Sequence, residues 1–173
     1  MNTRQSHHGV FMAVADVGVV IIGKAGVGKS SFALELLSQG HRLIADDVID
    51  FDLDDGVVTG HCPALLQGLL HTHEMGLISI TNVFGKDASI KQYTVNYVVE
   101  LIEHPQQSAD LDHQNQTYSL LNQSFPLLKL STHNPCSLTH RLLCWLKMQS
   151  QSTDYIDDLQ HQQQAMMLAS ANA

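Results

Sequence analysis

A segment of eight residues near the start of the chain carries the clearest signal for chemistry. Residues 23 to 30 read Gly-Lys-Ala-Gly-Val-Gly-Lys-Ser, which matches the phosphate-binding pattern G-x-x-x-x-G-K-[ST]. In such a loop the backbone amides and the following helix N-terminus surround phosphate oxygens, the lysine reaches the β- and γ-phosphates, and the hydroxyl binds Mg²⁺. We therefore assign the nucleotide site to Gly23, Lys24, Ala25, Gly26, Val27, Gly28, Lys29, Ser30 and Ser31.

The residues on either side of the loop predict the strand and the helix that it requires. Residues 17 to 22 are a short apolar run rich in β-branched side chains, which is typical of a buried parallel strand. Residues 31 to 39 carry an apolar helical stripe, and Gly40 follows as a stop signal. This order favours a P-loop over an ordinary glycine-rich turn between a strand and a helix.

Two carboxylates follow the next apolar segment. Residues 41 to 45 predict a strand that ends in Asp46 and Asp47. Ligands of open α/β sheets bind at the carboxyl ends of the strands, so we expect this pair to lie near the γ-phosphate. The alternative is an exposed pair of aspartates in a turn.

The other elements complete an α/β pattern in one domain over residues 1 to 173. A strand at residues 10 to 15 is expected to pair with the strand that precedes the P-loop, and Asp54-Asp55-Gly56 marks a hairpin turn. In chain order, the further expected elements are strands at 48–51 and 57–59, a helix from Pro63 to Leu70, a strand at 77–80, a loop at 82–87, a strand at 93–102, a loop at 104–122 and a strand at 127–130. Residues 138–147 and 156–169 are expected to form a helical or mixed end.

Composition restricts the class of protein. The chain has 173 residues, 44% of them hydrophobic, which suits one globular domain. The net charge of −8 disfavours nucleic acid as a partner, because duplex binding needs a clustered basic surface. The 3 cysteines lack C-x-x-C spacing, and no segment resembles a signal peptide or a membrane span. We expect a cytoplasmic protein without a membrane partner.

Three segments together, the P-loop, residues 40–47 and residues 77–85, resemble the catalytic domain of the HPr kinase/phosphorylase family. The chain is similar to a short form without an N-terminal domain. Members transfer the γ-phosphate of ATP to a serine of a small phosphocarrier protein of the sugar phosphotransferase system, and reverse this by phosphorolysis. The resemblance implies a P-loop-containing kinase domain with a mixed central sheet flanked by helices, ATP and Mg²⁺ as cofactors, an HPr-like phosphocarrier as partner, and a homo-oligomer.

The resemblance also implies roles for individual residues. Asp46 or Asp47 takes the place of the catalytic base, which accepts the serine proton. His8 matches a histidine that lies near the phosphate in the family, although a solvated histidine near the terminus is the alternative. We expect Ser30 and Asp47 to hold Mg²⁺.

The chain departs from the family pattern at two loops. The family signature Leu-Glu-x-Arg-Gly-x-Gly aligns with residues 70 to 76, where His71 and His73 replace the two charged residues. A later basic loop aligns with residues 133 to 138, which lack its arginine. Solvated histidines are the interpretation that we favour, and the alternative is a zinc site that adds His61, Cys62 and Glu74.

The sequence is consistent with three candidate functions. The leading one is an ATP-dependent serine kinase that acts on an HPr-like protein. A second is an ATP-binding regulatory module that has lost phosphotransfer, which the altered signature loop favours. A small-molecule P-loop kinase is the third, but such enzymes grip phosphates with several arginines, and this chain has only Arg4, Arg42 and Arg141.

Overall fold

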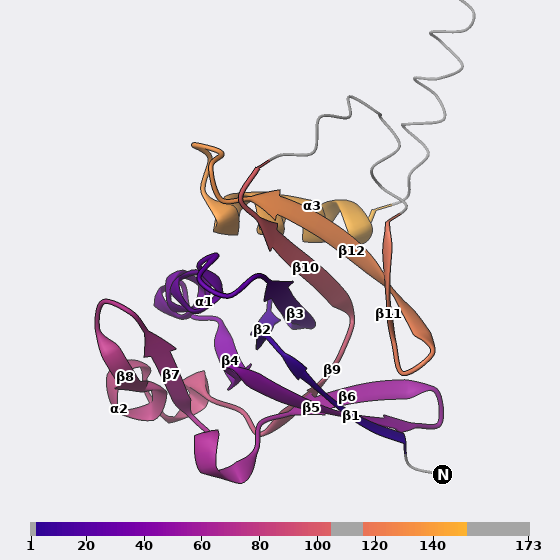
Figure 1. Cartoon of the computed structure of the whole chain (residues 1–173), viewed down its shortest axis with the longest axis horizontal. Coiled ribbons are helices and arrows are strands. Elements are labelled where there is room, and N and C mark those ends of the chain that lie inside the picture. The colour runs from indigo at the N-terminus through magenta and orange to yellow at the C-terminus, as the bar shows by residue number, and fades with distance from the viewer. Residues whose placement is uncertain (1–2, 105–115, 152–173) are drawn as a thin grey trace, which may run out of the picture. The chain divides into compact units, whose positions relative to one another are not determined.

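The computed structural model describes residues 3–104 and 116–151 of the chain (Figure 1). The chain divides into two compact units, residues 1–139 and residues 140–173. Strand β3 (Val17–Gly23) and helix α1 (Lys29–Ser38), which flank the P-loop, lie in the first unit. The second unit contains most of helix α3 (Leu138–Gln149).

The first unit is built on a six-stranded mixed sheet with the order β11-β12-β10-β3-β2-β4. β3 pairs in parallel with β10, and β10 with β12, whereas β2 is antiparallel to both β3 and β4. The four strands β3, β4, β10 and β12 therefore run in one direction and end at the same edge. The strands are β2 (Val10–Val14), β3 (Val17–Gly23), β4 (Arg42–Ala45), β10 (Tyr97–Ile102), β11 (Thr117–Leu120) and β12 (Gln123–Ser131).

A second, antiparallel sheet has the order β1-β5-β6-β9, and a separate hairpin joins β7 to β8. The chain passes from the second sheet into the first at Gly9, between β1 and β2. The strands of these two sheets are β1 (Thr3–His8), β5 (Val48–Asp54), β6 (Val57–His61), β9 (Gln92–Thr94), β7 (Leu69–Thr72) and β8 (Gly76–Ser79).

Helix α1 (Lys29–Ser38) contacts β2, β3, β4 and β7, and so links the large sheet to the hairpin (Figure 1). Its buried side chains are Phe32, Ala33, Leu36 and Leu37. The remaining helical segments of this unit are short: α2 (Ile80–Phe84) and the 3-10 turns η1 (Ala64–Leu66) and η2 (Lys86–Ala88).

The main core lies where the two large sheets meet. Phe11 of β2 and Phe51 of β5 are fully buried, with ring centroids 6.3 Å apart. Gly60 of β6 makes this packing fit, because a Cβ at that position would lie 2.7 Å from the ring of Phe11. Burial of large apolar side chains is the main favourable contribution to folding, so this contact fixes one sheet on the other.

Most elements near the P-loop lie where the sequence analysis predicted them. The hairpin of β2 and β3, the helix after the loop, β4, the hairpin of β5 and β6, β8 and the helix after residue 138 are confirmed. The α/β class with a mixed sheet is also confirmed. The single domain over 1–173 stays a prediction, and the expected helical or mixed end at 156–169 lies outside the described residues.

Four expectations were wrong. The helix from Pro63 to Leu70 is a 3-10 turn followed by strand β7, because the backbone is already extended at Gln67, with a ψ of 128°, and Gly68 turns it with a φ of 71°. The loop at 82–87 contains α2 and η2. The single strand at 93–102 is two strands, β9 and β10, in different sheets. The end of the loop at 104–122 forms β11, which turns into β12 at Leu121 and Asn122.

Candidate active site

The P-loop joins the end of β3 to the start of α1, as its sequence requires. Gly23 closes β3 with a φ of 144°, and a Cβ there would lie 2.6 Å from the carbonyl oxygen of Leu101. Gly28 precedes the helix with a φ of 104°, and no side chain caps the helix N-terminus. The first amides of α1 are therefore left for an anionic ligand, which the helix dipole also favours.

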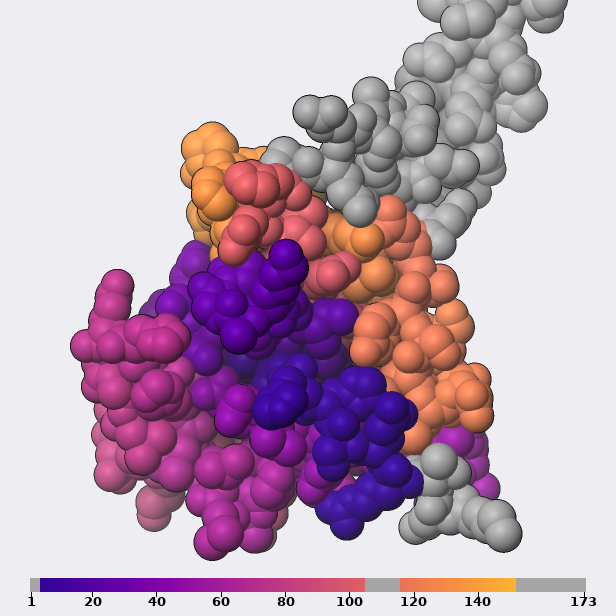
Figure 2. Space-filling model, viewed as in Figure 1, coloured from indigo at the N-terminus to yellow at the C-terminus, as the bar shows by residue number. Residues whose placement is uncertain are grey.

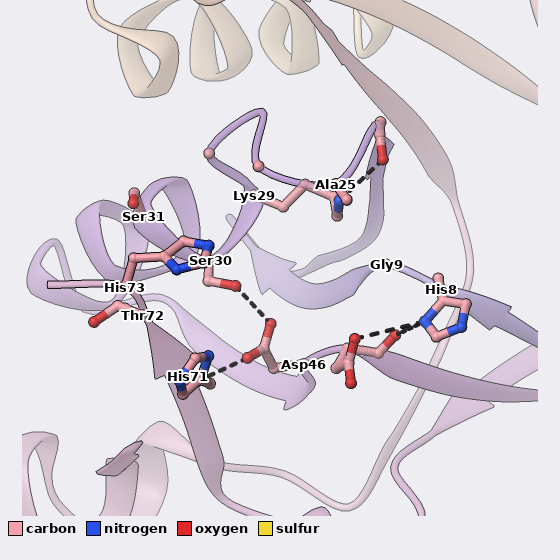
Figure 3. A pocket seen from close by; sticks show the side chains of 14 residues that line it. His8, Gly9, Ala25, Lys29, Ser30, Ser31, Asp46, His71, Thr72 and His73 are labelled. Atoms are coloured by element: carbon pink, nitrogen blue, oxygen red, sulfur yellow. Dashed lines mark hydrogen bonds and ion pairs between the residues drawn. The ribbon is translucent and has the colours of Figure 1, made fainter. Parts of the chain in front are cut away.

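Lys29 folds back over the loop that contains it (Figure 3). Its Nζ donates to the carbonyl oxygens of Gly23 at 2.9 Å and Lys24 at 3.0 Å. These contacts hold the two ends of the loop together and place the ammonium group at the cavity. A phosphate that enters here meets a cation in addition to the backbone amides.

Asp46 lies buried at the end of β4, beside the first turn of α1. Its Oδ1 accepts a hydrogen bond from Ser30 Oγ at 3.0 Å, and its Oδ2 accepts one from the backbone N–H of His71 at 2.9 Å (Figure 3). Burial raises the pKa of the Asp46 carboxyl, and the hydrogen bonds from His71 and Ser30 oppose that shift. The carboxylate is thus held rigidly with one oxygen at the hydroxyl of the P-loop.

Asp47 is the next residue, but its surroundings are different. Its side chain is 76% exposed, and its backbone has a φ of 70°, in the left-handed region. His8 Nδ1 lies 3.1 Å from the carbonyl oxygen of Asp47 and 3.5 Å from its Oδ1 (Figure 3). The backbone N–H of Gly9 donates to the same carbonyl oxygen at 3.1 Å. The end of β1 therefore fixes the position of Asp47.

These groups line one cavity of about 670 Å³. Four segments contribute to it: the P-loop, the end of β4, the end of β1 and the β7–β8 hairpin. In Figure 2 these segments lie at the surface that faces the viewer. Of the residues that the sequence assigned to the nucleotide site, Lys24 and Val27 do not line it. The lining residues are His8, Gly9, Gly23, Ala25, Gly26, Gly28, Lys29, Ser30, Ser31, Asp46, Asp47, His71, Thr72 and His73.

His71 and His73 extend from the hairpin, and both side chains are exposed. Their ring centroids are 6.1 Å apart, with an angle of 71° between the ring planes. The zinc alternative gains no support, since within residues 3–104 and 116–151 no three His, Cys, Asp or Glu side chains are placed to hold a metal ion. His61 lies on β6 instead, with its Nε2 3.0 Å from Arg4.

Two residues at the cavity carried no signal in the sequence. Gly9 is a single glycine between two polar histidines and an apolar strand, and Thr72 lies in a segment expected to follow a helix. Thr72 is buried, and its Oγ1 accepts a hydrogen bond from the backbone N–H of Met75 at 3.2 Å, which closes the hairpin turn. Only the pairing of β7 with β8 reveals this role.

A comparison with family models decides the relationship. Residues 1–166 match the model of the HPr Serine kinase C-terminal domain. The chain belongs to this family. Proteins of similar sequence include the HPr kinase/phosphorylase of Bordetella petrii, 44% identical over 96 residues, which are 55% of this chain and 31% of that protein. The HPr kinase/phosphorylase of Polaromonas naphthalenivorans is 40% identical over 121 residues, 69% of this chain and 38% of that protein.

A solved structure agrees with the family relationship. The HPr(Ser) kinase/phosphatase of Coxiella burnetii superposes with a TM-score of 0.78 at 27% sequence identity, over 91% of this chain and 97% of that one. The P-loop kinase fold expected from the sequence is thereby confirmed. The matched segments of the two curated relatives make up about a third of their length, 31% and 38%. Among the described helices, none is both long enough and apolar enough to cross a bilayer.

Proposed function

We propose that this chain is the catalytic domain of an ATP-dependent protein serine kinase/phosphorylase that acts on an HPr-like phosphocarrier protein. One observation carries the proposal. In a member of the HPr Serine kinase C-terminal domain family, one cavity brings together the P-loop, the Asp46–Ser30 pair and the Asp47–His8 pair. Phosphoryl transfer needs such positioned charges and a proton acceptor, and needs no covalent intermediate on the protein.

The P-loop is proposed to bind the phosphates of ATP. Backbone amides at Gly26 to Ser30 and the N-terminus of α1 surround the β-phosphate, and Lys29 moves its hydrogen bonds from its own loop carbonyls to the β- and γ-phosphate oxygens. An ammonium group at this position stabilises negative charge as it shifts to the leaving diphosphate.

The donors present fit Mg²⁺. Ser30 Oγ and Asp46 Oδ1 are oxygen atoms 3.0 Å apart beside the P-loop, and oxygen ligands of this kind are the ones that Mg²⁺ prefers. When bound, Mg²⁺ neutralises phosphate charge. We propose Ser30 and Asp46 as its holders, because Asp46 is buried against the hydroxyl. Asp47, which the sequence suggested for this role, faces solvent beside His8.

Asp47 is proposed as the catalytic base. Its exposed carboxylate accepts the proton of the acceptor serine while the serine oxygen forms a bond to the γ-phosphorus, and the bond from that phosphorus to the β-phosphate bridging oxygen breaks to release ADP. His8 holds Asp47 in place through the contacts to its carbonyl and Oδ1. In phosphorolysis an oxygen of inorganic phosphate forms a bond to the phosphorus of phosphoserine, and the bond from that phosphorus to the serine oxygen breaks. Asp47, protonated by the incoming phosphate, gives its proton to the serine oxygen, and pyrophosphate leaves.

We further propose that the enzyme is a homo-oligomer in the cytoplasm, where ATP is available. Neither nucleic acid nor a membrane is a partner in this proposal. The family relationship and the net charge of −8 support these points.

A transfer assay tests the function directly. The purified chain is incubated with γ-labelled ATP, MgCl₂ and an HPr protein, with the same HPr carrying Ala in place of the acceptor serine as control. We expect label on the native HPr alone. Tight ATP binding without any labelled HPr would instead favour the regulatory module, and no ATP binding at all would refute both.

A further inference from the structure

Two histidine rings are stacked on each other at the same edge of the sheet as the P-loop, outside the cavity. His104 follows β10 and His133 follows β12, and their ring centroids are 5.2 Å apart with an angle of 22° between the planes. Both side chains are exposed. Stacking covers one flat face of each ring, and the exposure of both residues leaves room for a ligand beside the pair.

Hydrogen bonds between the two strand ends hold this pair in place. The backbone N–H of Thr132 donates to the carbonyl oxygen of Ile102 at 2.9 Å, and Ser131 Oγ donates to that of Glu103 at 3.2 Å. His133 Nδ1 also contacts the carbonyl oxygen of Glu103. These contacts define the orientation of the His133 ring with respect to β10.

The ends of β10 and β12 are connected to the two elements that flank the P-loop, strand β3 and helix α1. Leu101 of β10 pairs with Gly23, and His104 is three residues further, at most about 10 Å along the chain. On the other side, Ser137 Oγ donates to Glu35 Oε1 of α1 at 2.7 Å. The stacked rings thus lie within reach of a nucleotide whose phosphates occupy the P-loop.

The geometry of phosphoryl transfer indicates on which side of the P-loop the purine ring of that nucleotide lies. Attacking and leaving oxygens lie roughly in line through the transferred phosphorus. Asp46, Asp47 and His8 lie toward β4 and β1, so the acceptor approaches from there. The nucleoside must then leave on the opposite side of the P-loop, toward the ends of β10 and β12.

We propose that His104 and His133 form a stacking platform for the purine base of the nucleotide. The inference rests on the proposed function, because it needs a nucleotide in the P-loop. A base that stacks on an aromatic face gains affinity that is nearly independent of the identity of the base. We therefore expect the site to accept GDP nearly as well as ADP.

Calorimetry of the full chain in the presence of MgCl₂ separates the base from the phosphates. ADP, GDP and pyrophosphate are titrated into the native protein and into the variants His133→Ala, His104→Ala and His133→Phe. We expect each alanine variant to bind ADP and GDP about tenfold more weakly. Pyrophosphate affinity should change less than twofold, which also shows that the variants are folded. His133→Phe keeps a flat aromatic face, so it should bind ADP within about twofold of the native protein.

Each result has a definite meaning. Failure of the native chain to bind either ADP or pyrophosphate refutes the proposed function and the platform together. Normal ADP binding by both alanine variants refutes the platform alone. The platform is also refuted if the alanine variants lose ADP and pyrophosphate affinity to the same extent. It is refuted as well if His133→Phe loses as much ADP affinity as His133→Ala, because the histidines would then affect loop structure and would not stack on the purine ring.

Discussion

The P-loop and the β7–β8 hairpin form two walls of the same cavity, but they contribute to it in different ways. The P-loop depends on its own residue types, since its glycines adopt positive φ angles and Lys29 bonds to its own loop carbonyls. The hairpin supports Asp46 through the backbone N–H of His71, while His71 and His73 are exposed. A backbone contact survives a change of side chain, so the hairpin can carry His71 and His73 without losing its hold on Asp46.

The largest expected effect comes from the P-loop. Lys29→Met removes the ammonium group at the β/γ-phosphates, and we expect transfer to fall by roughly 10²-fold or more, with weaker ATP binding. Calorimetry and the HPr labelling assay measure the two effects. Lys24→Met is the matched control, because Lys24 is an exposed lysine of the same loop that does not line the cavity, and it should stay within about threefold of native. Equal behaviour of the two variants would remove the special role of Lys29.

A loss of similar size is expected at the end of β4. Asp47→Asn removes the proposed proton acceptor and keeps the shape of the side chain, so transfer should fall by about 10²-fold while ADP affinity changes little. His8→Ala should have a smaller effect, because His8 positions Asp47 and does not accept the proton. Full transfer activity in Asp47→Asn would exclude it as the base and direct attention to Asp46.

A gain of activity is expected from the hairpin. An imidazole ring is neither a permanent cation nor a carboxylate, the two groups that the family pattern has here, so His71→Glu with His73→Arg should raise transfer by roughly several-fold to tenfold. ADP affinity should change less. Glu74→Gln in the same exposed turn is the control and should leave the rate as it is. If the double variant is no faster than the native chain, the histidines already serve the reaction.

The smallest effect concerns stability and pH. Burial raises the pKa of Asp46, so the folded protein binds the proton more tightly than the unfolded chain, whose Asp pKa is about 3.9. The nucleotide-free protein therefore loses stability as pH rises from about 3.9 through the higher folded pKa. Asp46→Asn removes this loss, since its amide can donate to Ser30 Oγ and accept from His71.

Thermal melts of both proteins between pH 4 and 8 measure that effect. At pH 7 and without Mg²⁺, we expect Asp46→Asn to melt at a higher temperature than the native protein, because its uncharged amide avoids the cost of burying the carboxylate. The difference should vanish toward pH 4. A variant that melts lower at every pH would mean that the charged hydrogen bonds outweigh the cost of burial.

The parts of the site that local sequence determines could be predicted, and the parts that pairing determines could not. The P-loop and the strand that ends in Asp46 and Asp47 carry their own signals of glycine spacing and β-branched runs. β1 reads Thr-Arg-Gln-Ser-His-His, a polar segment that becomes a strand only because β5 pairs with it, with His8 opposite Val48. The sequence therefore indicated His8 but gave no reason for its place beside Asp47.

The two aspartates show the same limit. The sequence names both as candidates for the catalytic base and Asp47 as the Mg²⁺ ligand, whereas the fold gives the two side chains different surroundings. Asp46 meets Ser30 and the backbone of His71, whereas the left-handed backbone at Asp47 turns its side chain to solvent. Burial and hydrogen bonding of one carboxylate depend on residues up to 25 positions away, so no local pattern reports them.

The crossover at Gly9 connects the backbone of one sheet directly to the catalytic end of the other. A Cβ at this position would lie 2.8 Å from the carbonyl oxygen of Ile21, and the Gly9 N–H donates to the carbonyl oxygen of Asp47. That single amide proton is thus a natural spectroscopic probe. Its NMR frequency and its exchange with deuterium follow the position of Asp47 without any label at the cavity, and they would record whether added nucleotide or HPr shifts this proposed base.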